Sequence, residues 1–480
     1  MQSYLIEFFI AGFGILLLMW EAFAAPKNKA SIALIGAAGL TAALGWLIYI
    51  STCGCTAVTE VPEWLSRFYS NGGNALFFKG FALVSTILVL LMSYEFRGVL
   101  NRYTSHNNSD AHAGEFYTLP IFACAGLMWM ASATDLVSIF VALELVTITF
   151  YIMVAYMRRN VGSLEAGVKY LILGALSTGF LVYGIAWLYG ALGTTDITQF
   201  SGRITDSYTL LFGLALIIVA LGFKVGAAPM QLWIPDVYQG APTPITAYLS
   251  VASKAAGFGV AIAILRPFLA YGSPVQDAVV TILVIMAAAT LLYGNLSALA
   301  QTNFKRLLAY SSIAHAGFIL LAFATGDFTT VQFYLATYLI MTFAGFFILN
   351  LVRVQEDSDE ISVFDGLGKR NPRLALALTI IMASMAGVPL TAGFYGKFLV
   401  FGAAIGTISW TVIAIAFIAA AAGFYYYFKV IRAIYWHAPK NEEALSIPCI
   451  SKVVIAVLTL ALVVFGVWPQ PIMDLIISSR

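Results

Sequence analysis

The sequence predicts an α-helical polytopic membrane protein with about fourteen transmembrane helices. Three observations lead to this fold class. The chain of 480 residues is 61% hydrophobic and only 10% charged, with a mean hydropathy of +0.90, whereas an ordinary soluble domain is about 25% charged. Apolar stretches of the roughly 20 residues that cross a bilayer follow one another along almost the whole chain. These stretches do not alternate apolar and polar residues, as the strands of a membrane β-barrel would.

The apolar stretches set the expected order of the spans. The fourteen spans are 4–23, 30–50, 74–94, 114–133, 135–156, 163–190, 208–235, 243–265, 276–300, 304–325, 329–351, 373–404, 407–428 and 453–478. The polar segments between them are too short for a soluble domain, so we expect one membrane domain. Its expected parts are three N-terminal helices in 1–113, a five-helix repeat in 114–271, a second repeat in 272–433 and a C-terminal helix in 434–480.

Basic residues predict the orientation of the chain. No Lys or Arg precedes the first span, while Lys27 and Lys29 follow it, which is the reverse of a signal peptide. Loops after odd-numbered spans are rich in Lys and Arg, whereas loops after even-numbered spans hold only Arg67, Arg203 and Arg266. Because basic loops stay in the cytoplasm, both termini are expected on the outer face of the membrane.

Two spans are interrupted by proline. The seventh contains Pro229 and the twelfth contains Pro389, followed by Gly393 and Gly396. Proline removes a helical hydrogen bond, and in lipid the freed backbone groups need protein or a hydrated cavity around them. The two breaks lie five spans apart. Because five is odd, a repeat of spans 4–8 by spans 9–13 is inverted across the membrane, which is typical of an ion or substrate path near the midplane.

Ionisable residues inside the spans are the main functional candidates. They are Glu144, Lys169, Lys224, Lys254, His315 and Lys397. A charge at the bilayer centre costs about 2.5 to 3.5 kcal/mol, so such residues need inward positions, shared protons or hydration. Burial lowers the proton affinity of a lysine and a nearby carboxylate raises it. A series of lysines balanced between these effects is typical of a proton relay.

Each of these residues also has a simpler structural interpretation. Lys79, Glu7 and Glu21 lie near span ends, where snorkelling or a structural ion pair is the favoured explanation. A structural pair is equally open for Lys169, and His315 is alternatively a hydrogen-bonded packing residue. The relay interpretation is strongest for Glu144, Lys224, Lys254 and Lys397 taken together, because Lys224 and Lys397 lie on the proline-broken spans.

Other chemistries lack sequence support. The glycine-rich segments 257–262 and 366–371 each lack the third glycine of a dinucleotide fingerprint, and no P-loop, C-x-x-C or H-E-x-x-H motif is present. We therefore expect no NAD, ATP, iron–sulfur, flavin or metal site in this chain. Cys53 and Cys55 form an isolated C-G-C with no assigned role.

Five motifs resemble one family over nearly the whole chain. They are SLEAGVKY (163–170), GFKVGAAPMQLWIPDVYQGAPTPI (222–245), QTNFKRLLAYSSIAHAG (301–317), GVPLTAGFYGKF (387–398) and FGVWPQP (465–471). Together they resemble subunit N of NADH:quinone oxidoreductase, respiratory complex I, one of its three antiporter-like membrane subunits. PDVYQGAP and Lys397 resemble subunit N more than its two siblings, and the chain ends soon after PQP, without the long lateral helix of one sibling.

The resemblance implies a proton channel in a redox-driven pump. It implies that Glu144 pairs with Lys224, that Lys169 modulates this pair, that Lys254 and His315 form the central relay, and that Lys397 is the terminal lysine. FMN, iron–sulfur clusters, NADH and quinone would belong to other subunits. The implied partners are other membrane-arm subunits, including the two siblings, and the implied location is the cell inner (cytoplasmic) membrane, with periplasmic termini.

Two alternatives remain open at this point. The first is a subunit of a multi-subunit cation/proton antiporter, which shares this ancestry. The second is a scaffold whose buried charges pair without moving protons. The sequence does not distinguish H⁺ from Na⁺.

Overall fold

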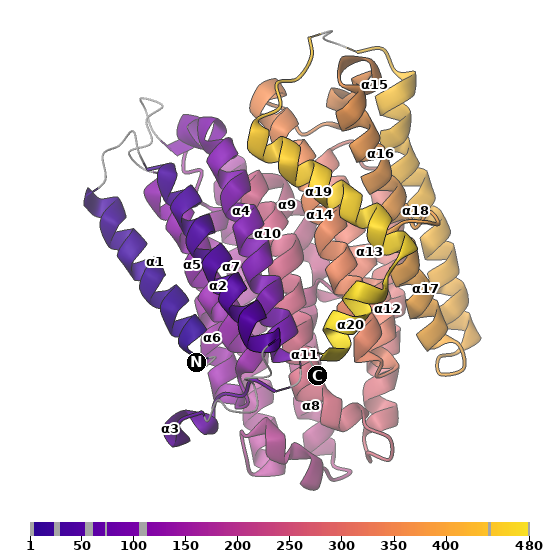
Figure 1. The fold of residues 1–480 in the computed structure, drawn as a ribbon. Coiled ribbons are helices and arrows are strands. Elements are labelled where there is room, and N and C mark those ends of the chain that lie inside the picture. Colours follow the sequence, from indigo (N-terminus) through magenta and orange to yellow (C-terminus); the bar gives the residue numbers. More distant parts are fainter. Residues whose placement is uncertain are drawn as a thin grey trace. The chain divides into compact units, whose positions relative to one another are not determined.

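The described part of the chain is almost entirely helical. The computed structural model describes residues 4–23, 29–52, 61–72, 74–104, 113–439 and 443–478 (Figure 1). Within these ranges the only β-type pairings are three isolated bridges. Lys27, Cys53 and Cys55 lie outside the described residues. The predicted all-α fold class is confirmed.

Contacts divide the chain into two compact units: Met1–Val225 with Gly240–Ile282 and Ile476–Arg480, and Gly226–Gln239 with Leu283–Leu475. The helices of the first unit are α1 (Leu5–Phe23), α2 (Ser31–Thr52), α3 (Glu63–Ser66), α4 (Ala75–Thr104), α5 (Gly114–Ser132), α6 (Leu136–Val154), α7 (Val161–Leu192), the 3₁₀ helix η4 (Ile197–Gly202), α8 (Tyr208–Val225), α10 (Thr243–Tyr248), the π-helix η6 (Leu249–Ser253) and α11 (Lys254–Leu269).

The first helix of the second unit in chain order is the 3₁₀ helix η5. Its helices are η5 (Met230–Leu232), α9 (Trp233–Gly240), α13 (Phe304–Ala324), α14 (Phe328–Glu356), η7 (Ile361–Phe364), α15 (Leu367–Arg370), α16 (Pro372–Ala386), α17 (Ala392–Ala404), α18 (Trp410–Trp436), α19 (Cys449–Val467) and α20 (Gln470–Ser478). Boundaries between the units fall within α12 (Gln276–Leu299), between Val225 and Gly226, at Gly240, the last residue of α9, and within α20, whose residues from Ile476 on belong to the first unit. The predicted repeat boundaries, 114–271 and 272–433, stay a prediction.

Most predicted spans correspond to one helix each. Twelve helices of the described residues are long and apolar enough to cross a membrane, and α5 and the pair α16/α17 correspond to the two other predicted spans. Span 453–478, predicted as one continuous helix, is two helices, because α19 ends at Val467 and α20 starts at Gln470. Pro469 lies between them, and proline disfavours a helical conformation for the residue before it.

Small residues bring helices close together in both units. In the first unit, a Cβ on Gly184 of α7 would lie 3.1 Å from the Gly213 carbonyl of α8. In the second, a Cβ on Gly294 of α12 would lie 2.6 Å from the backbone nitrogen of Ala314 in α13. Glycine at such contacts lets membrane helices approach backbone to backbone.

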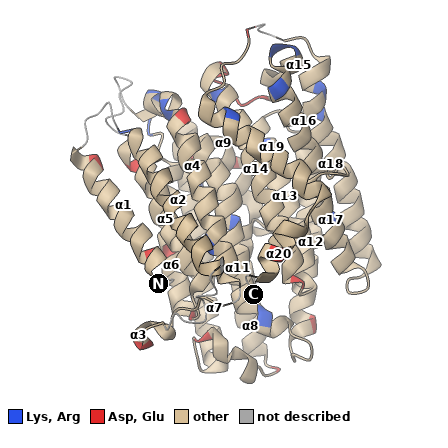
Figure 2. Cartoon of the chain, viewed as in Figure 1, with Lys and Arg blue, Asp and Glu red and all other residues tan. Residues whose placement is uncertain are grey.

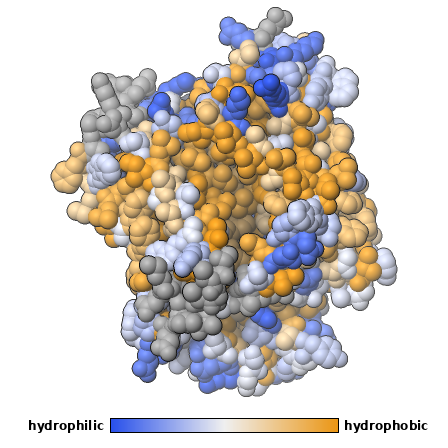
Figure 3. Space-filling view, viewed as in Figure 1, coloured by the Kyte–Doolittle hydropathy of each residue, from blue (hydrophilic) through white to orange (hydrophobic). Residues whose placement is uncertain are grey.

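Charges and apolar residues are distributed as a bilayer requires. Figure 2 shows most charged residues near helix ends, with few inside the helices. On the face shown in Figure 3, hydrophobic residues predominate over the middle of the helices and hydrophilic residues gather near their ends. The helices α13 and α14 are almost completely buried.

A short loop beyond α7 carries a shifted carboxyl group. Asp196 caps η4 and accepts hydrogen bonds from the Thr198 backbone nitrogen at 3.0 Å and from the Gln199 amide at 2.8 Å. Partial burial raises the pKa of Asp196, but a hydrogen bond from the Thr198 hydroxyl at 2.6 Å, together with the two named above, outweighs burial and holds the pKa below its usual value.

Candidate functional site

The first unit places Glu144 and Lys224 around two threonines, the buried Thr147 and the half-buried Thr178. Glu144 and Thr147 are three residues apart on α6, so they share one helix face. The Lys224 ammonium on α8 donates a hydrogen bond to Thr147 Oγ1. Thr178 Oγ1 on α7 donates to Glu144 Oε1 at 2.8 Å, and the Glu144 carboxylate acts electrostatically on Lys224. Three helices therefore bring the predicted carboxylate and lysine into one polar cluster.

The helix that carries Lys224 ends earlier than the proline predicts. α8 ends at Val225, and Gly226 follows with φ +79°. A Cβ on Gly226 would lie 2.3 Å from Ile234 Cδ1, so the turn requires glycine in both conformation and space. Pro229 lies within the break, and the freed backbone nitrogen of Ala228 donates to Thr290 Oγ1 at 2.8 Å. The break therefore starts at a glycine, and a threonine satisfies one of its polar groups.

Lys254 follows a π-helical turn that the sequence did not indicate. The π-helix spans Leu249–Ser253, and Lys254 is the first residue of α11. A single π-helical turn within a helix often marks a functional position. A Cβ on Gly257 would lie 3.2 Å from Lys224 Cβ, so the absence of a side chain there brings α11 against α8.

A small cavity links this part of α11 with the Lys224 cluster. Its volume is about 10 Å³, and its lining includes Thr147, Lys224, Ser253 and Gly257. A cavity of about this size is the smallest that accommodates one water molecule. The geometry therefore allows one water between the Lys224 cluster and Ser253, the neighbour of Lys254.

In the second unit, His315 lies between two tyrosines. Its Nδ1 is 2.8 Å from the Tyr334 hydroxyl and its Nε2 is 3.1 Å from the Tyr427 hydroxyl. The Tyr427 hydroxyl also hydrogen bonds to Ser311 Oγ. The chain Tyr334–His315–Tyr427–Ser311 can pass protons by hydroxyl and imidazole groups alone. The sequence analysis missed both tyrosines, which lie 19 and 112 residues from His315.

Lys397 lies across the second helix break from its acceptors. α16 ends at Ala386, Gly387 has φ +89°, and α17 begins at Ala392. The Lys397 ammonium donates to the carbonyls of Met385 at 3.0 Å and Ala386 at 2.8 Å. These carbonyls belong to the last turn of α16, where backbone acceptors are unpaired and the helix dipole favours a cation.

Lys169 lies in a different environment from the other candidate lysines. Its side chain is 42% exposed and forms an ion pair with Glu165 at 2.7 Å, one turn earlier on α7. It does not take part in the contacts described above around Glu144 and Lys224. Its predicted modulating role stays a prediction.

The residues assigned to structural pairing form ion pairs. Lys79 is fully buried and lies 2.7 Å from Glu7 Oε1. It also donates to the Tyr69 hydroxyl and to Asn71 Oδ1, each at 2.7 Å. Glu21 pairs with Lys29. The ion-pair interpretation is therefore confirmed for these residues, while Lys79 does not snorkel to water.

The described residues contain no group of three or more His, Cys, Asp and Glu side chains that could hold a metal ion. The lysine, carboxylate, imidazole and hydroxyl groups of the clusters described above can exchange protons.

The comparisons with known proteins agree with this fold. The model of the family described as "NADH:quinone oxidoreductase/Mrp antiporter, TM" matches residues 133–423. Among solved structures, a chain of respiratory complex I from Thermus thermophilus has a TM-score of 0.80 and 30% identity, with 98% of this chain and 99% of that chain covered. A chain of an archaeal membrane-bound sulfane sulfur reductase has a TM-score of 0.86 and 27% identity, with 99% and 96% covered. The fold and these matches thus define an antiporter-like membrane subunit.

Sequence relatives narrow this class. "NADH-quinone oxidoreductase subunit N 2" of Chloroherpeton thalassium is 36% identical, with 98% of this chain and 93% of the relative covered. "NADH-quinone oxidoreductase subunit N" of Trichlorobacter lovleyi is 38% identical, with 91% and 88% covered. The chain belongs to the family of NADH-quinone oxidoreductase subunit N.

Proposed function

We propose that this chain is a proton-translocating membrane-arm subunit of an NADH:quinone oxidoreductase. Protons pass along a relay of Glu144, Lys224, Lys254, His315 and Lys397, with Lys169 as a modulating residue. The transfer is coupled to NADH oxidation and quinone reduction, for which other subunits supply FMN, iron–sulfur clusters and the substrate sites. The partners are the other membrane-arm subunits, including two antiporter-like siblings, in the inner membrane with both termini periplasmic.

The observation that carries this proposal is the cluster of Glu144, Thr147 and Lys224, in which Thr147 and Lys224 are buried and Glu144 is half-buried. A lysine beside a carboxylate changes its proton affinity when the carboxylate gains or loses a proton. Burial strengthens this coupling, because charges interact more strongly in a medium of low dielectric constant. The cluster can therefore convert a charge change at Glu144 into proton release at Lys224.

NADH-driven proton uptake into inverted membrane vesicles tests the proposal. Lys224→Met and Glu144→Gln remove the titrating group with little change in side-chain size. Each is expected to reduce proton uptake by about tenfold or more, the scale of a lost acid–base group. Lys369→Met is the matched control, since Lys369 lies exposed on α15. Wild-type proton uptake in Lys224→Met, with normal assembly of the complex, would sink the proposal.

A second candidate is a subunit of a multi-subunit cation/proton antiporter. The family model names both classes, and a chain of the Mrp complex from Dietzia shares the fold, with a TM-score of 0.79 at 18% identity. Sodium-driven proton exchange in vesicles without NADH favours this alternative. Proton uptake that requires NADH and quinone favours the first.

A further inference from the structure

We propose that Lys305 and Asp359 form a proton-exchange site at the first turn of α13. At this site a proton from water passes to side chains along the helix that carries His315. The inference rests on the proposed function and adds a point of proton uptake to it. Sequence position alone places Lys305 at the edge of the predicted span 304–325, among the basic residues that follow an odd-numbered span. In the structure its side chain is only 3% exposed.

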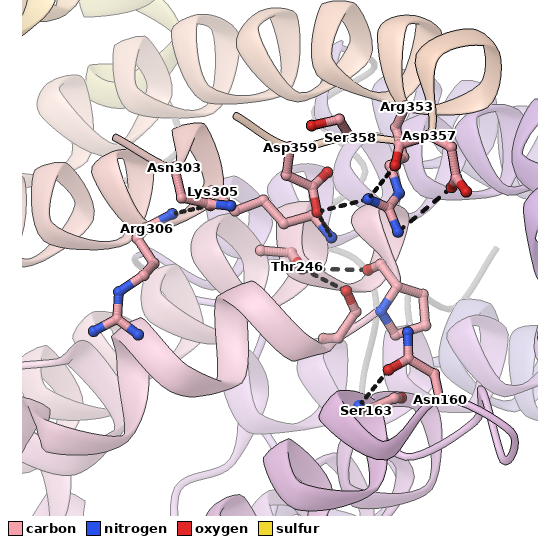
Figure 4. Close-up of polar contacts among 12 residues, drawn as sticks. Asn160, Ser163, Thr246, Asn303, Lys305, Arg306, Arg353, Asp357, Ser358 and Asp359 are labelled. Atoms are coloured by element: carbon pink, nitrogen blue, oxygen red, sulfur yellow. Dashed lines mark hydrogen bonds and ion pairs between the residues drawn. The ribbon is translucent and has the colours of Figure 1, made fainter. Parts of the chain in front are cut away.

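Backbone pairing fixes the loop after α14 against the start of α13. The Phe304 nitrogen donates to the Asp359 carbonyl at 2.7 Å, and the Ile361 nitrogen donates to the Thr302 carbonyl at 2.8 Å. Asn303 caps α13 and forms an isolated bridge with Glu360. Figure 4 shows the resulting arrangement, in which the Lys305 side chain extends toward Asp359. The pair is thus placed by the backbone and does not depend on its own attraction.

The ion pair is poorly arranged for a purely structural role. Lys305 Nζ lies 3.6 Å from Asp359 Oδ2, longer than a normal hydrogen bond. Arg353 Nη1 approaches the same oxygen at 3.2 Å. The other oxygen, Oδ1, is buried and has no hydrogen-bond partner among the described residues. A buried pair stabilises a fold only when its remaining lone pairs are satisfied, so Oδ1 is a free acceptor for a proton or a water.

Exposure increases outward from the pair. The side chain of Asp359 is 10% exposed, that of Arg353 16%, and that of Asp357, which pairs with Arg353, 48%. Water therefore reaches Asp359 from the loop, while Lys305 lies behind it. By the charge bias of the loops, this end of α13 is the cytoplasmic one, the side from which a respiratory proton pump takes up protons.

The inward side of the site lies along α13. Ser312 is seven residues after Lys305, so it lies on nearly the same helix face about 10 Å away. The Ser312 hydroxyl is 3.3 Å from the Tyr238 hydroxyl, and His315 follows one turn later. The flexible four-carbon stem of Lys305 can span part of this distance, and the proposal places water over the rest.

The transfer conserves every proton. A hydronium ion from the aqueous side protonates the Asp359 carboxylate. The carboxyl O–H bond then breaks as an N–H bond forms on the neutral Lys305 amine, which restores the carboxylate–ammonium pair. The ammonium next loses a proton to water on the Ser312 side and becomes neutral again. No electron is transferred.

The neighbouring cation shows what a structural clamp looks like. Arg306 Nη1 donates to Asp236 Oδ1 at 3.0 Å and to Gln239 Oε1 at 2.9 Å, and so ties α9 to α13. Its side chain is 30% exposed, and a guanidinium does not lose its proton in proteins. These adjacent residues thus have different roles: Arg306 holds α9 against α13, and Lys305 exchanges protons.

The test is a charge-conserving substitution that blocks proton release. Lys305→Arg keeps the positive charge and the attraction to Asp359, but the guanidinium retains its proton. NADH-driven proton uptake into vesicles is expected to fall about tenfold or more, as for a lost acid–base group. Arg306→Lys is the control and is expected to stay within about twofold, the scale of an exposed ion pair. Wild-type proton uptake in Lys305→Arg would overturn the inference.

A second pair of variants decides the matter if Lys305→Arg does not assemble. Asp359→Asn cannot take up a proton, whereas Asp359→Glu can. Proton uptake that is lost in the first and restored in the second supports the inference, and wild-type uptake in both overturns it. Lys224→Met separates the two proposals: if it is impaired while Lys305→Arg is normal, only the inference fails. If both are normal, the proposed function fails as well.

Discussion

The two broken spans place a lysine beside an interrupted helix in different ways. In the span of α8 and α9, Lys224 precedes the break, one residue before the end of α8. In the span of α16 and α17, Lys397 follows the break and donates back to the carbonyls of Met385 and Ala386. The same sequence signature, a lysine near a proline in an apolar span, therefore gives two local structures.

The difference lies in what compensates each charge. Lys224 is hydrogen bonded to Thr147 and lies in the field of Glu144, which can gain and lose a proton. Lys397 interacts with the end of a helix, whose dipole is fixed. We infer that Lys224 responds to a signal carried by Glu144, whereas Lys397 has a constant environment and responds only to the arrival of a proton.

The largest expected effect is a difference in energetic coupling between two pairs of residues, Glu144 with Lys224 and Glu144 with Lys397. Glu144→Gln and Lys224→Met should each reduce proton uptake by about tenfold or more, and the double variant should be no worse than either single one. Glu144→Gln combined with Lys397→Met should multiply the two single effects, since sites without shared partners add in free energy. A double-mutant cycle on NADH-driven proton uptake measures both. Equal coupling in the two cycles would contradict the distinction.

The next effect concerns the glycines at the two breaks. Gly387 and Gly226 both have positive φ, so alanine costs about 1–2 kcal/mol of backbone strain at either position. A Cβ on Gly387 would lie 3.0 Å from Lys397 Cδ, whereas one on Gly226 would meet Ile234. Both variants should lower the temperature of thermal inactivation. Only Gly387→Ala should also reduce proton uptake per assembled complex, because it displaces the lysine.

A smaller effect is expected at Thr147. Thr147→Val keeps the shape but removes the acceptor for Lys224, a loss of about 1 kcal/mol, which is several-fold in proton uptake. Thr149→Val is the matched control on the same helix, since Thr149 bonds only its own α6 backbone among the contacts described, at Leu145. Identical behaviour of the two variants would show that the Thr147 hydroxyl does not serve Lys224.

The smallest effect is expected at Lys169. Its exposed pair with Glu165 on one helix is worth about 0.3–0.5 kcal/mol. Lys169→Met should therefore change proton uptake less than twofold, in keeping with a modulating role. A loss as large as that of Lys224→Met would show that Lys169 belongs to the relay itself.

The sequence predicts what depends on composition and misses what depends on packing. Apolar length alone indicates the spans. Charges inside apolar spans single out Glu144, Lys224, Lys254 and Lys397, because a charge that is costly to bury can be recognised from the sequence alone. The π-helix before Lys254 has no proline or glycine signal within its five residues.

Distant partners are equally hidden. Tyr427 reaches His315 across 112 residues, and the backbone pairing of the Asp359 loop with the start of α13 brings the Asp359 carboxylate to the buried Lys305. Sequence position alone groups Lys305 with the basic residues that follow an odd-numbered span. A lysine at a span boundary is therefore better assigned after tertiary contacts are known than from its position along the chain.

The two phenols on either side of His315 impose a direction on proton movement. A neutral imidazole donates through one nitrogen and accepts through the other, so the hydroxyls of Tyr334 and Tyr427 must point in a matching sense. When a proton enters at one end and leaves at the other, every bond in Tyr334–His315–Tyr427–Ser311 reverses its polarity. The chain cannot carry a second proton the same way until its hydroxyls and ring have turned back. The orientation of these hydrogen bonds therefore depends on the last transfer. The chain must reorient before a second proton can pass in the same direction.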